Sequence, residues 1–468
     1  MPHTDSGATL IETRSIDFIP ETERHGKLSS QFTLWMGTNL QITAIVTGAL
    51  AVVLGGDVFW SLVGLLIGQM LGGTVMALHA AQGPQLGLPQ MISSRVQFGV
   101  YGAVIPIVLV CFMYVGFSAS GTVLAGQAIA TLFDVSGNAG ILSFGLLIII
   151  LTLFGYRLIH LLGRAASVIG VTAFVILFGA LMAQHDLLQV LQTDCHFTLP
   201  HFLLAVSLSA SWQIAYGPYV ADYSRYLPST ISPLKTFLAV GAGAVLGTQA
   251  SMTLGVFAAA LAGKQFAGNE VGFIVGLGGA GLVAGFLYFS IIFGKVIATT
   301  LNSYGSFMSL ATIVSGFTGN RRISALVRLS YIVLMVGLST TLALLGQHSF
   351  LHIFKSFILF LLAFFTPWSA INLVDFYWVT KSRYDLKALS DPNGRYGRWN
   401  RVGISVYLIG IVIQLPFLAT GFYTGPMVEK LGDTDISWII GLVIPGLLYY
   451  WAARRWPTAV PASLILPD

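Results

Sequence analysis

Apolar residues follow one another along this chain in runs that are long enough to cross a membrane. A helix rises 1.5 Å per residue, so about twenty residues span a hydrocarbon core of about 30 Å. The runs show no strand-like alternation of apolar and polar positions, so we predict helices. The twelve predicted spans cover residues 31–53, 58–81, 100–130, 138–155, 165–184, 200–221, 236–262, 272–299, 326–346, 351–377, 402–422 and 436–453.

Two of these spans contain polar residues together with glycine or proline at mid-depth. The first contains the run Trp35–Gln41, and the sixth contains the run Ser211–Pro218. If spans one to five form one repeat, the next repeat is inverted and span six is the counterpart of span one. Paired interrupted helices of this kind mark the binding site of a transporter. The alternative is that glycine and proline are simply commoner in membrane helices than in soluble ones.

The pairing of these two spans predicts an all-α membrane protein with two inverted five-helix repeats. We expect a cytoplasmic tail at 1–30, a first repeat at 31–184 and a second repeat at 200–378. Two additional helices follow at 402–455, and a second cytoplasmic tail closes the chain at 456–468.

Composition supports a membrane protein. Of the 468 residues, 55% are hydrophobic and only 9% are charged, whereas a soluble domain carries about 25% charged residues. So few charges cannot cover a water-facing surface, so lipid must cover much of it. Cys111 falls in a span and Cys195 in a loop, which does not suggest a disulfide framework.

The basic residues predict which side of the membrane each loop occupies. With the N-terminus inside, the predicted outer segments hold only Lys264, Lys355 and Lys430. The inner segments hold Arg14, Arg24, Lys27, Arg95, Arg157, Arg164, Arg225, Lys235, Arg321, Arg322, Arg328, Lys381, Arg383, Lys387, Arg395, Arg398, Arg401, Arg454 and Arg455. This bias predicts both termini in the cytoplasm and a chain in the cell (inner) membrane. The net charge of +5 therefore reflects membrane sidedness and does not indicate nucleic-acid binding.

Aromatic residues within the spans are candidates for ligand contacts. Tyr114 and Ser118 are four residues apart and share one helix face, where a ring and a hydroxyl could contact a flat ligand. The alternative is packing against a neighbouring helix. Trp212 lies at the interruption of span six, and its alternative role is an anchor at the membrane interface.

Charged and amide residues within or beside the spans are a second group of candidates. Lys295 is the one basic residue placed well inside a predicted span, and Asn302 follows two helical turns later. An intramembrane ionisable group suggests function, although a lysine can also reach the interface with its long side chain. Asp222 and Arg225 end span six at a spacing that allows them to pair, either as a gate or as a structural clamp. The glycine- and proline-rich segment 83–95 predicts an ordered inner loop.

Enzymatic and channel functions find no support in the sequence. It lacks a His-Glu-x-x-His motif and an Asp-rich metal motif, and its nine histidines are not spaced as metal ligands are. We therefore predict no cofactor and no metal. A repeated selectivity filter or ring of charges is also missing. The alternative to a transporter is a membrane receptor or sensor that uses the same fold.

Three segments of the sequence are distinctive: Gly87–Met91 continuing to Ser94-Arg95, Pro218–Pro228 and Leu301–Tyr304, of which the second is the most specific. Together they resemble the nucleobase–cation symporter family, in its purine–cytosine permease branch. The similarity covers about residues 28 to 455. It implies a LeuT-like fold of two inverted five-helix repeats plus two further helices, and a transporter that imports a nucleobase, purine or cytosine, together with a cation.

The resemblance also implies where the substrate binds. A base would lie between an aromatic residue of span three, here Tyr114 where relatives often have tryptophan, and Trp212 of span six. Gln41 and Asn302 match polar substrate contacts, and Ser118 stands where some relatives have glutamine. Such a pocket suits a planar heterocycle, because stacking on each base is worth about 1–3 kcal/mol and amide groups read its edge. Uracil, allantoin, hydantoins and vitamin precursors are the alternative substrates.

The sequence departs from the family pattern at the residues expected to bind the coupling ion. Sodium-coupled relatives use hydroxyls of span eight at positions that here hold Val296 and Ile297, which cannot bind a cation. We therefore expect coupling to H⁺ rather than Na⁺, with the neighbouring Lys295 as a tethered cation that donates to carbonyls near Gly37 and Leu40. The alternatives are a permanently charged structural lysine, and Asp222 as the proton carrier.

Overall fold

The computed structural model describes residues 17–153, 156–193, 195–319, 324–421, 423–457 and 460–466. Within these residues the chain is helical, apart from two isolated β-bridges. The predicted N-terminal tail as far as residue 16, including Arg14, and the inner residues Arg321 and Arg322 lie outside the described residues.

The α-helices follow one another with short connections. They are α1 (Leu28–Asn39), α2 (Ile42–Val53), α3 (Val58–Leu86), α4 (Gln90–Phe98), α5 (Val104–Phe133), α6 (Gly137–Leu153), α7 (Tyr156–Gln184), α8 (Leu187–Gln192), α9 (Leu199–Ile214), α10 (Gly217–Ser224), α11 (Pro233–Ala262), α12 (Glu270–Gly278), α13 (Leu282–Thr318), α14 (Ala325–Gly346), α15 (Phe350–Val374), α16 (Arg401–Gln414), α17 (Pro426–Lys430) and α18 (Ser437–Arg455).

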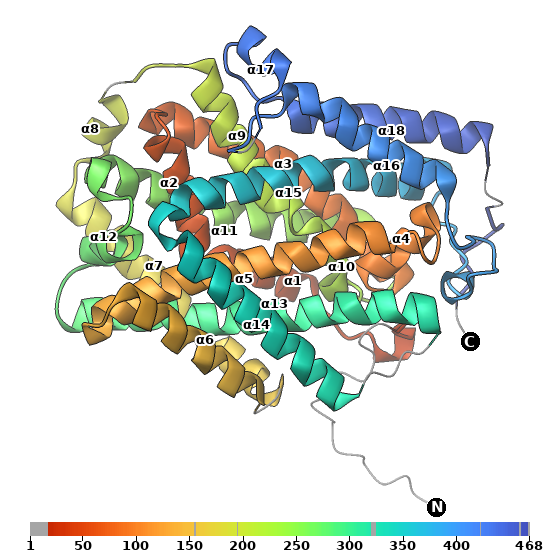
Figure 1. The fold of residues 1–468 in the computed structure, drawn as a ribbon, viewed down its shortest axis with the longest axis horizontal. Coiled ribbons are helices and arrows are strands. Elements are labelled where there is room, and N and C mark those ends of the chain that lie inside the picture. The colour runs from red at the N-terminus through yellow and green to blue at the C-terminus, as the bar shows by residue number, and fades with distance from the viewer. Residues whose placement is uncertain are drawn as a thin grey trace, which may run out of the picture.

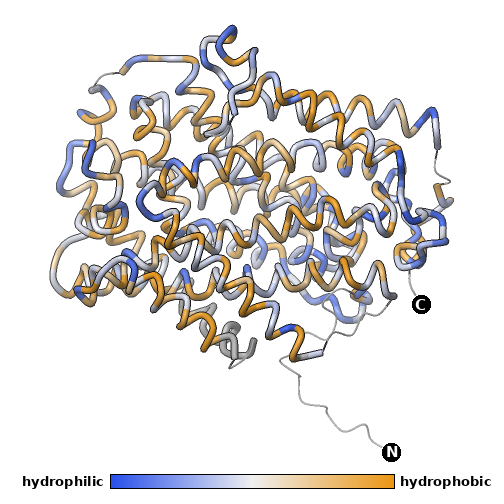
Figure 2. Tube along the Cα trace, in the orientation of Figure 1, coloured by the Kyte–Doolittle hydropathy of each residue, from blue (hydrophilic) through white to orange (hydrophobic). Residues whose placement is uncertain are grey.

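Many of the long helices run along one common direction, which is horizontal in Figure 1. Figure 2 shows hydrophobic residues along the helices and hydrophilic ones gathered mainly at their ends and connections. Within the described residues, six helical stretches are long and apolar enough to cross a membrane, and α1 with α2 adds a seventh, bent by 58°. The predicted total of twelve spans stays a prediction.

Both predicted interruptions are confirmed as breaks between helices. In span one, α1 ends at Asn39 and α2 begins at Ile42. In span six, α9 ends at Ile214 and α10 begins at Gly217. Pro218, at the second position of α10, has no backbone N–H to continue the helical ladder of the preceding turn.

The predicted start of span eight is wrong. Residues 270–278 form the separate short helix α12, and the long helix α13 begins only at Leu282 and continues to Thr318. The cause is the sequence Gly278-Gly279-Ala280-Gly281, in which Gly279 and Gly281 have φ angles of 132° and 60° that favour glycine. This shift places Lys295 and Asn302 well inside α13.

The segment that we predicted as an inner loop is instead largely helical. Residues 83–86 complete α3, and residues 90–95 belong to α4, whose nine residues are all buried. Gly87, with φ of 61°, closes α3 in the left-handed conformation. The segment is therefore ordered, as predicted, but as two helices joined by a short turn.

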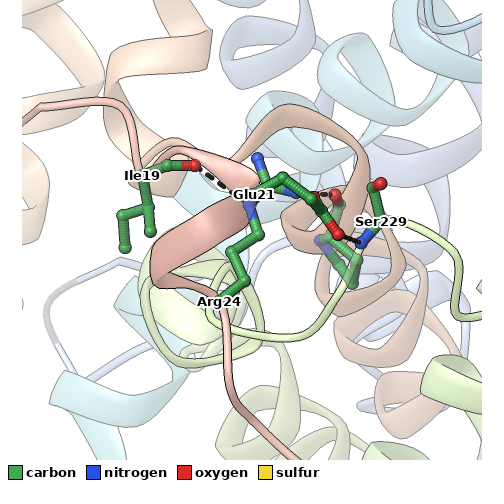
Figure 3. Close-up of polar contacts among 5 residues, drawn as sticks. Ile19, Glu21, Arg24 and Ser229 are labelled. Carbon is green, nitrogen blue, oxygen red and sulfur yellow. Dashed lines mark hydrogen bonds and ion pairs between the residues drawn. The ribbon is translucent and has the colours of Figure 1, made fainter.

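Both predicted tails take part in the packed structure. Ile19 donates its N–H to the Gly87 carbonyl, and Arg24 donates from Nε to the Ile19 carbonyl at 2.9 Å. The Glu21 carboxylate accepts the Ser229 N–H at 2.9 Å, as Figure 3 shows. Near the C-terminus, Ile465 exchanges backbone hydrogen bonds with the segment that begins at Tyr384. These contacts cover the end of the molecule where α4 and α10 lie (Figure 1).

Glycines allow α2 and α11 to pack with their backbones in contact. A Cβ atom at Gly255 of α11 would stand 1.8 Å from the carbonyl oxygen of Ile45. A Cβ atom at Gly48 of α2 would stand 2.2 Å from the carbonyl oxygen of Met252. Small residues at membrane helix interfaces permit this close approach and the van der Waals contact that it gives. The half of span one beyond the break is thereby held firmly against α11.

Replacing Gly255 with leucine should destabilise the protein, because neither backbone can move aside. Overpacking of this kind costs about 1–3 kcal/mol. We expect the thermal unfolding midpoint of the purified protein in detergent to fall by several degrees. Gly337→Leu is the matched control, since nothing lies within 4 Å of a Cβ at that position of α14. Equal midpoints for the two variants would contradict the close packing of α2 on α11.

Candidate functional site

A cavity of about 1400 Å³ lies among α1, α2, α5, α9, α10 and α13. The predicted site residues that line it are Gly37, Leu40, Gln41, Tyr114, Trp212, Asp222, Lys295 and Asn302. The structure therefore brings residues from four distant parts of the sequence together around one space. Ser118 is not among the lining residues.

The break in span one provides the polar wall of this cavity. Gln41 is extended, with φ of −150° and ψ of 155°, so the helical hydrogen-bond ladder is interrupted there. The Leu40 N–H donates a hydrogen bond to the Gly37 carbonyl at 3.1 Å, and the Gln41 N–H donates one to the Asn39 carbonyl at 3.0 Å. Irregular backbone at membrane depth is tolerated where it faces protein or a cavity, and here it faces both.

Lys295 extends from α13 to this break. Its Nζ donates to the side-chain oxygen of Gln41 at 2.7 Å and to the hydroxyl of Thr43. The lysine stem passes beside α5, where a Cβ atom at Gly121 would lie 3.2 Å from Lys295 Cδ. Lys295 is only 4% exposed and forms no ion pair with the residues that the structure describes.

The predicted acceptors of Lys295 are therefore wrong in detail. The lysine bonds to side-chain oxygens of Gln41 and Thr43 rather than to carbonyls near Gly37 and Leu40. The Gly37 carbonyl already accepts the Leu40 N–H, whereas the two side-chain oxygens are available as neutral acceptors. The expected contact between α13 and the break in span one is nevertheless present.

Gln41 links the lysine to the break. Its amide nitrogen donates to the Thr38 carbonyl at 3.0 Å, and its oxygen accepts hydrogen bonds from both Lys295 and Thr43. Both ends of the amide are thus engaged by protein groups in this structure. A direct contact between Gln41 and a substrate remains a prediction.

Trp212 is held at the break of span six. Its Nε1 donates to Asn39 Oδ1 at 2.8 Å, and the ring of Phe117 meets it edge-on with centroids 5.8 Å apart. Asn39 was not predicted as a site residue, although it lies in the same interrupted polar run as Gln41. The run therefore pointed to this residue, but a sequence pattern does not show that Asn39 is fully buried.

Tyr114 lies in the wall formed by α5. Its ring packs against the ring of Tyr219 with centroids 5.6 Å apart, and its hydroxyl end lies against α13, where a Cβ at Gly305 would be 2.6 Å away. Tyr219 also lines the cavity and was not predicted. Ser118 is fully buried, and its hydroxyl has no hydrogen-bond partner among the described residues.

Asn302 faces the same space from α13. Its side chain is partly exposed to the cavity and makes no hydrogen bond with a described residue. An amide offers two donors and one acceptor with two lone pairs. Among the predicted polar contacts that line the cavity, Asn302 is therefore the one whose side-chain hydrogen-bonding groups remain available for a ligand.

Asp222 lies at the end of the cavity where α4 and α10 meet. Its carboxylate accepts the N–H of Gln90, the first residue of α4, at 2.8 Å. A carboxylate stabilises a helix N-terminus because the N–H groups there lack intrahelical partners. Arg225 donates from Nε to the Asp222 backbone carbonyl at 3.2 Å.

The two α13 positions that the sequence analysis matched to sodium ligands are apolar. Val296 is buried and Ile297 lines the cavity. Thr299 also lines the cavity, and the Thr300 hydroxyl donates to the Val296 carbonyl at 2.7 Å. No cluster of three or more His, Cys, Asp or Glu residues suited to a metal ion occurs within the described residues.

Sequence comparison adds an independent line of information. The family model for permeases for cytosine and purines, uracil, thiamine and allantoin matches residues 18–441. The YxlA protein of Bacillus subtilis, a proposed purine-cytosine permease, is 40% identical over 442 residues, which are 94% of this chain and 95% of that protein. The purine-cytosine permease fcyB of Emericella nidulans is 23% identical over 94% of this chain and 87% of its own length.

Solved structures of Mhp1, a nucleobase-cation-symport-1 family transporter, share the fold. The inward-facing form has a TM-score of 0.78 at 18% identity and covers 98% of this chain and 99% of its own. The closed form with bound bromovinylhydantoin has a TM-score of 0.73 at 18% identity, covering 97% and 98%. These matches confirm the predicted LeuT-like class of helical membrane fold.

Proposed function

The chain belongs to the family of permeases for cytosine and purines, uracil, thiamine and allantoin, and we propose that it imports a purine base or cytosine by cation symport. As a member of this family, it is a multi-pass membrane permease rather than an enzyme. The proposal extends this family membership to a substrate class, a coupling ion and a set of binding residues.

One observation carries the substrate proposal: the cavity combines aromatic rings with an available amide. Trp212 and Tyr114 contribute rings from two different helices, and Asn302 contributes donors and an acceptor. A planar base has two faces that stack on rings and an edge that bonds to an amide. The named relatives are described as purine-cytosine permeases, which favours these bases.

Two alternatives compete with this proposal. Another small heterocycle, such as uracil, allantoin, a hydantoin or a vitamin precursor, would use the same stacking faces with a different edge. A non-transporting receptor would bind the ligand in the same cavity without moving it across the membrane. An uptake measurement distinguishes both from nucleobase transport.

Protons are the proposed coupling ions, and Lys295 is the proposed carrier. Its ammonium bridges α13 to Gln41 and Thr43 beyond the break in span one, where a bound sodium ion would otherwise join these helices. Loss of the proton would remove the positive charge and weaken that bridge. A bond that forms and breaks with protonation can shift the balance between two conformations. Asp222 is the alternative proton carrier.

The proposed orientation places both termini in the cytoplasm. It is supported by the excess of basic residues in the segments assigned to that side. In this orientation the cavity extends toward the cytoplasm, because His25, Pro89 and Arg225 also line it. At the opposite end the lining residues Leu177 and Ile274 are buried.

Proteoliposomes should accumulate a nucleobase against its concentration gradient. Adenine, guanine, hypoxanthine and cytosine would be offered first as radiolabelled substrates, followed by the alternative heterocycles. Uptake should saturate and should be absent from protein-free liposomes. If none of these compounds is moved or bound, the proposed substrate class is wrong, and binding without uptake would favour a receptor.

Substitutions in the pocket should weaken substrate binding without preventing membrane insertion. Trp212→Ala removes a stacking face and Asn302→Ala removes an edge contact, so each should raise Kd about tenfold to a hundredfold, equivalent to about 1–3 kcal/mol. Tyr114→Phe should have a smaller effect than Tyr114→Ala if the ring face matters most. Trp451→Ala, at a site that is 61% exposed, is the control for loss of a tryptophan. Unchanged Kd in both Trp212→Ala and Asn302→Ala would place the pocket elsewhere.

Uptake should depend on an imposed pH gradient, acid outside, and not on sodium. Lys295→Met should abolish this accumulation, because methionine fills similar space but carries no proton. Lys355→Met is the matched control, since Lys355 is a half-buried lysine of α15 that does not line the cavity.

Two results would contradict proton coupling through Lys295. One is uptake that requires sodium and ignores the pH gradient. The other is a Lys295→Met variant that still concentrates substrate when the proton gradient is applied. If that variant concentrates substrate but Asp222→Asn does not, the carrier role passes to Asp222.

A further inference from the structure

Asn39, the last residue of α1, joins the two helix breaks through its side chain. Its Oδ1 accepts one hydrogen bond from Trp212 Nε1 at 2.8 Å and another from the Tyr216 hydroxyl at 3.0 Å. Trp212 lies in the last turns of α9, and Tyr216 lies in the short connection to α10. One side-chain oxygen from span one therefore binds both the end of α9 and the connection that follows it.

The chemistry of the partners determines how this amide is oriented. Indole N–H is a donor only, so the group that faces Trp212 must be the amide oxygen. The amide nitrogen then points the other way and donates to the Trp35 carbonyl at 2.7 Å. The backbone carbonyl of Asn39 accepts from the Ser251 hydroxyl at 2.7 Å, which ties the residue to α11. Asn39 is fully buried, so water does not compete for these bonds.

The bond to Trp212 acts on the ring that forms one wall of the cavity. An indole ring can rotate about its side-chain bonds, and only one orientation presents a chosen face to the cavity. The hydrogen bond at Nε1 holds one edge of the ring, and the edge-on contact with Phe117 limits the other directions. Pre-organising an aromatic face before binding lowers the entropic cost of binding.

We infer that Asn39 is a positioning residue that fixes the stacking face of Trp212 through its hydrogen bonds to Trp212 and Tyr216. Asn39 does not line the cavity and does not contact the substrate; it acts through the ring. The inference rests on the proposed function, since it gives Trp212 the role of a nucleobase stacking face. It also makes substrate affinity depend on the joining of spans one and six.

Equilibrium binding to purified variants tests this role, with tritiated adenine, guanine, hypoxanthine or cytosine as the probe, whichever the wild type binds. Asn39→Leu keeps a similar side-chain size but removes both bonds, and it should raise Kd about tenfold or more. Tyr216→Phe removes one of the two bonds and should fold normally. Its Kd should rise about twofold to fivefold.

A double-mutant cycle separates positioning from general packing. Trp212→Phe lacks the indole N–H, so adding Asn39→Leu to it should raise Kd by less than about threefold. Gln213→Leu is the matched control: its amide donates to Gln69 at 2.5 Å, next to Trp212 in sequence but away from the cavity. This control should lower the thermal midpoint while leaving Kd unchanged.

The outcomes distinguish the inference from the proposed function. If the wild type binds a base and Asn39→Leu and Tyr216→Phe bind it equally well, the positioning role is overturned and nucleobase transport stands. Fully additive effects of Asn39→Leu and Trp212→Phe would overturn it as well. If the wild type binds none of the bases, the proposed function fails and the positioning role fails with it.

Discussion

The need to satisfy polar groups in an apolar interior governs the site of this protein. Where span one is interrupted between Asn39 and Ile42, the helical ladder can no longer supply every hydrogen bond. A hydroxyl from another helix supplies one backbone partner, and a lysine from a further helix binds the polar side chains at the break. Lys295 of α13 binds Gln41 and Thr43, and Ser251 of α11 binds the Asn39 carbonyl. Residues of α11 and α13 therefore both bond to the break in span one, and the cavity lies beside it.

The same requirement divides the polar residues of the cavity into two groups. Gln41 is engaged at its amide nitrogen by Thr38 and at its oxygen by Lys295 and Thr43, so it helps to hold the break together in this structure. The side chain of Asn302 makes no hydrogen bond with a described residue and lines the cavity. Desolvating an amide without a partner is costly, so a ligand that bonds to Asn302 on entering gains more than one that does not. This difference is the physical basis of the proposed specificity for the edge of a heterocycle.

A second polar cluster connects the cavity with the rest of the molecule at its α4 end. The Asp222 carboxylate binds the N-terminus of α4, and further along α4 the Gln97 amide donates to the Asp375 carboxylate at 2.8 Å. Asp375 also accepts hydrogen bonds from Tyr384 and Tyr449. α4 thus connects α10 with the end of α15 and with α18. This buried helix therefore links one end of the cavity to elements that do not line it.

The sequence by itself determined the class of protein and the two breaks, because lipid contact and interrupted apolar runs are recorded locally in residue order. It also named eight of the residues that line the cavity, including Trp212, Lys295 and Asn302. Only the tertiary structure decided which of them meet. Lys295 and Gln41 are separated by 254 positions, and Trp212 and Asn39 by 173, so no local pattern could pair them. The glycines before Leu282 likewise end a helix that hydropathy alone continues. Hydropathy records only how apolar a segment is, whereas hydrogen-bond partners depend on which helices pack together.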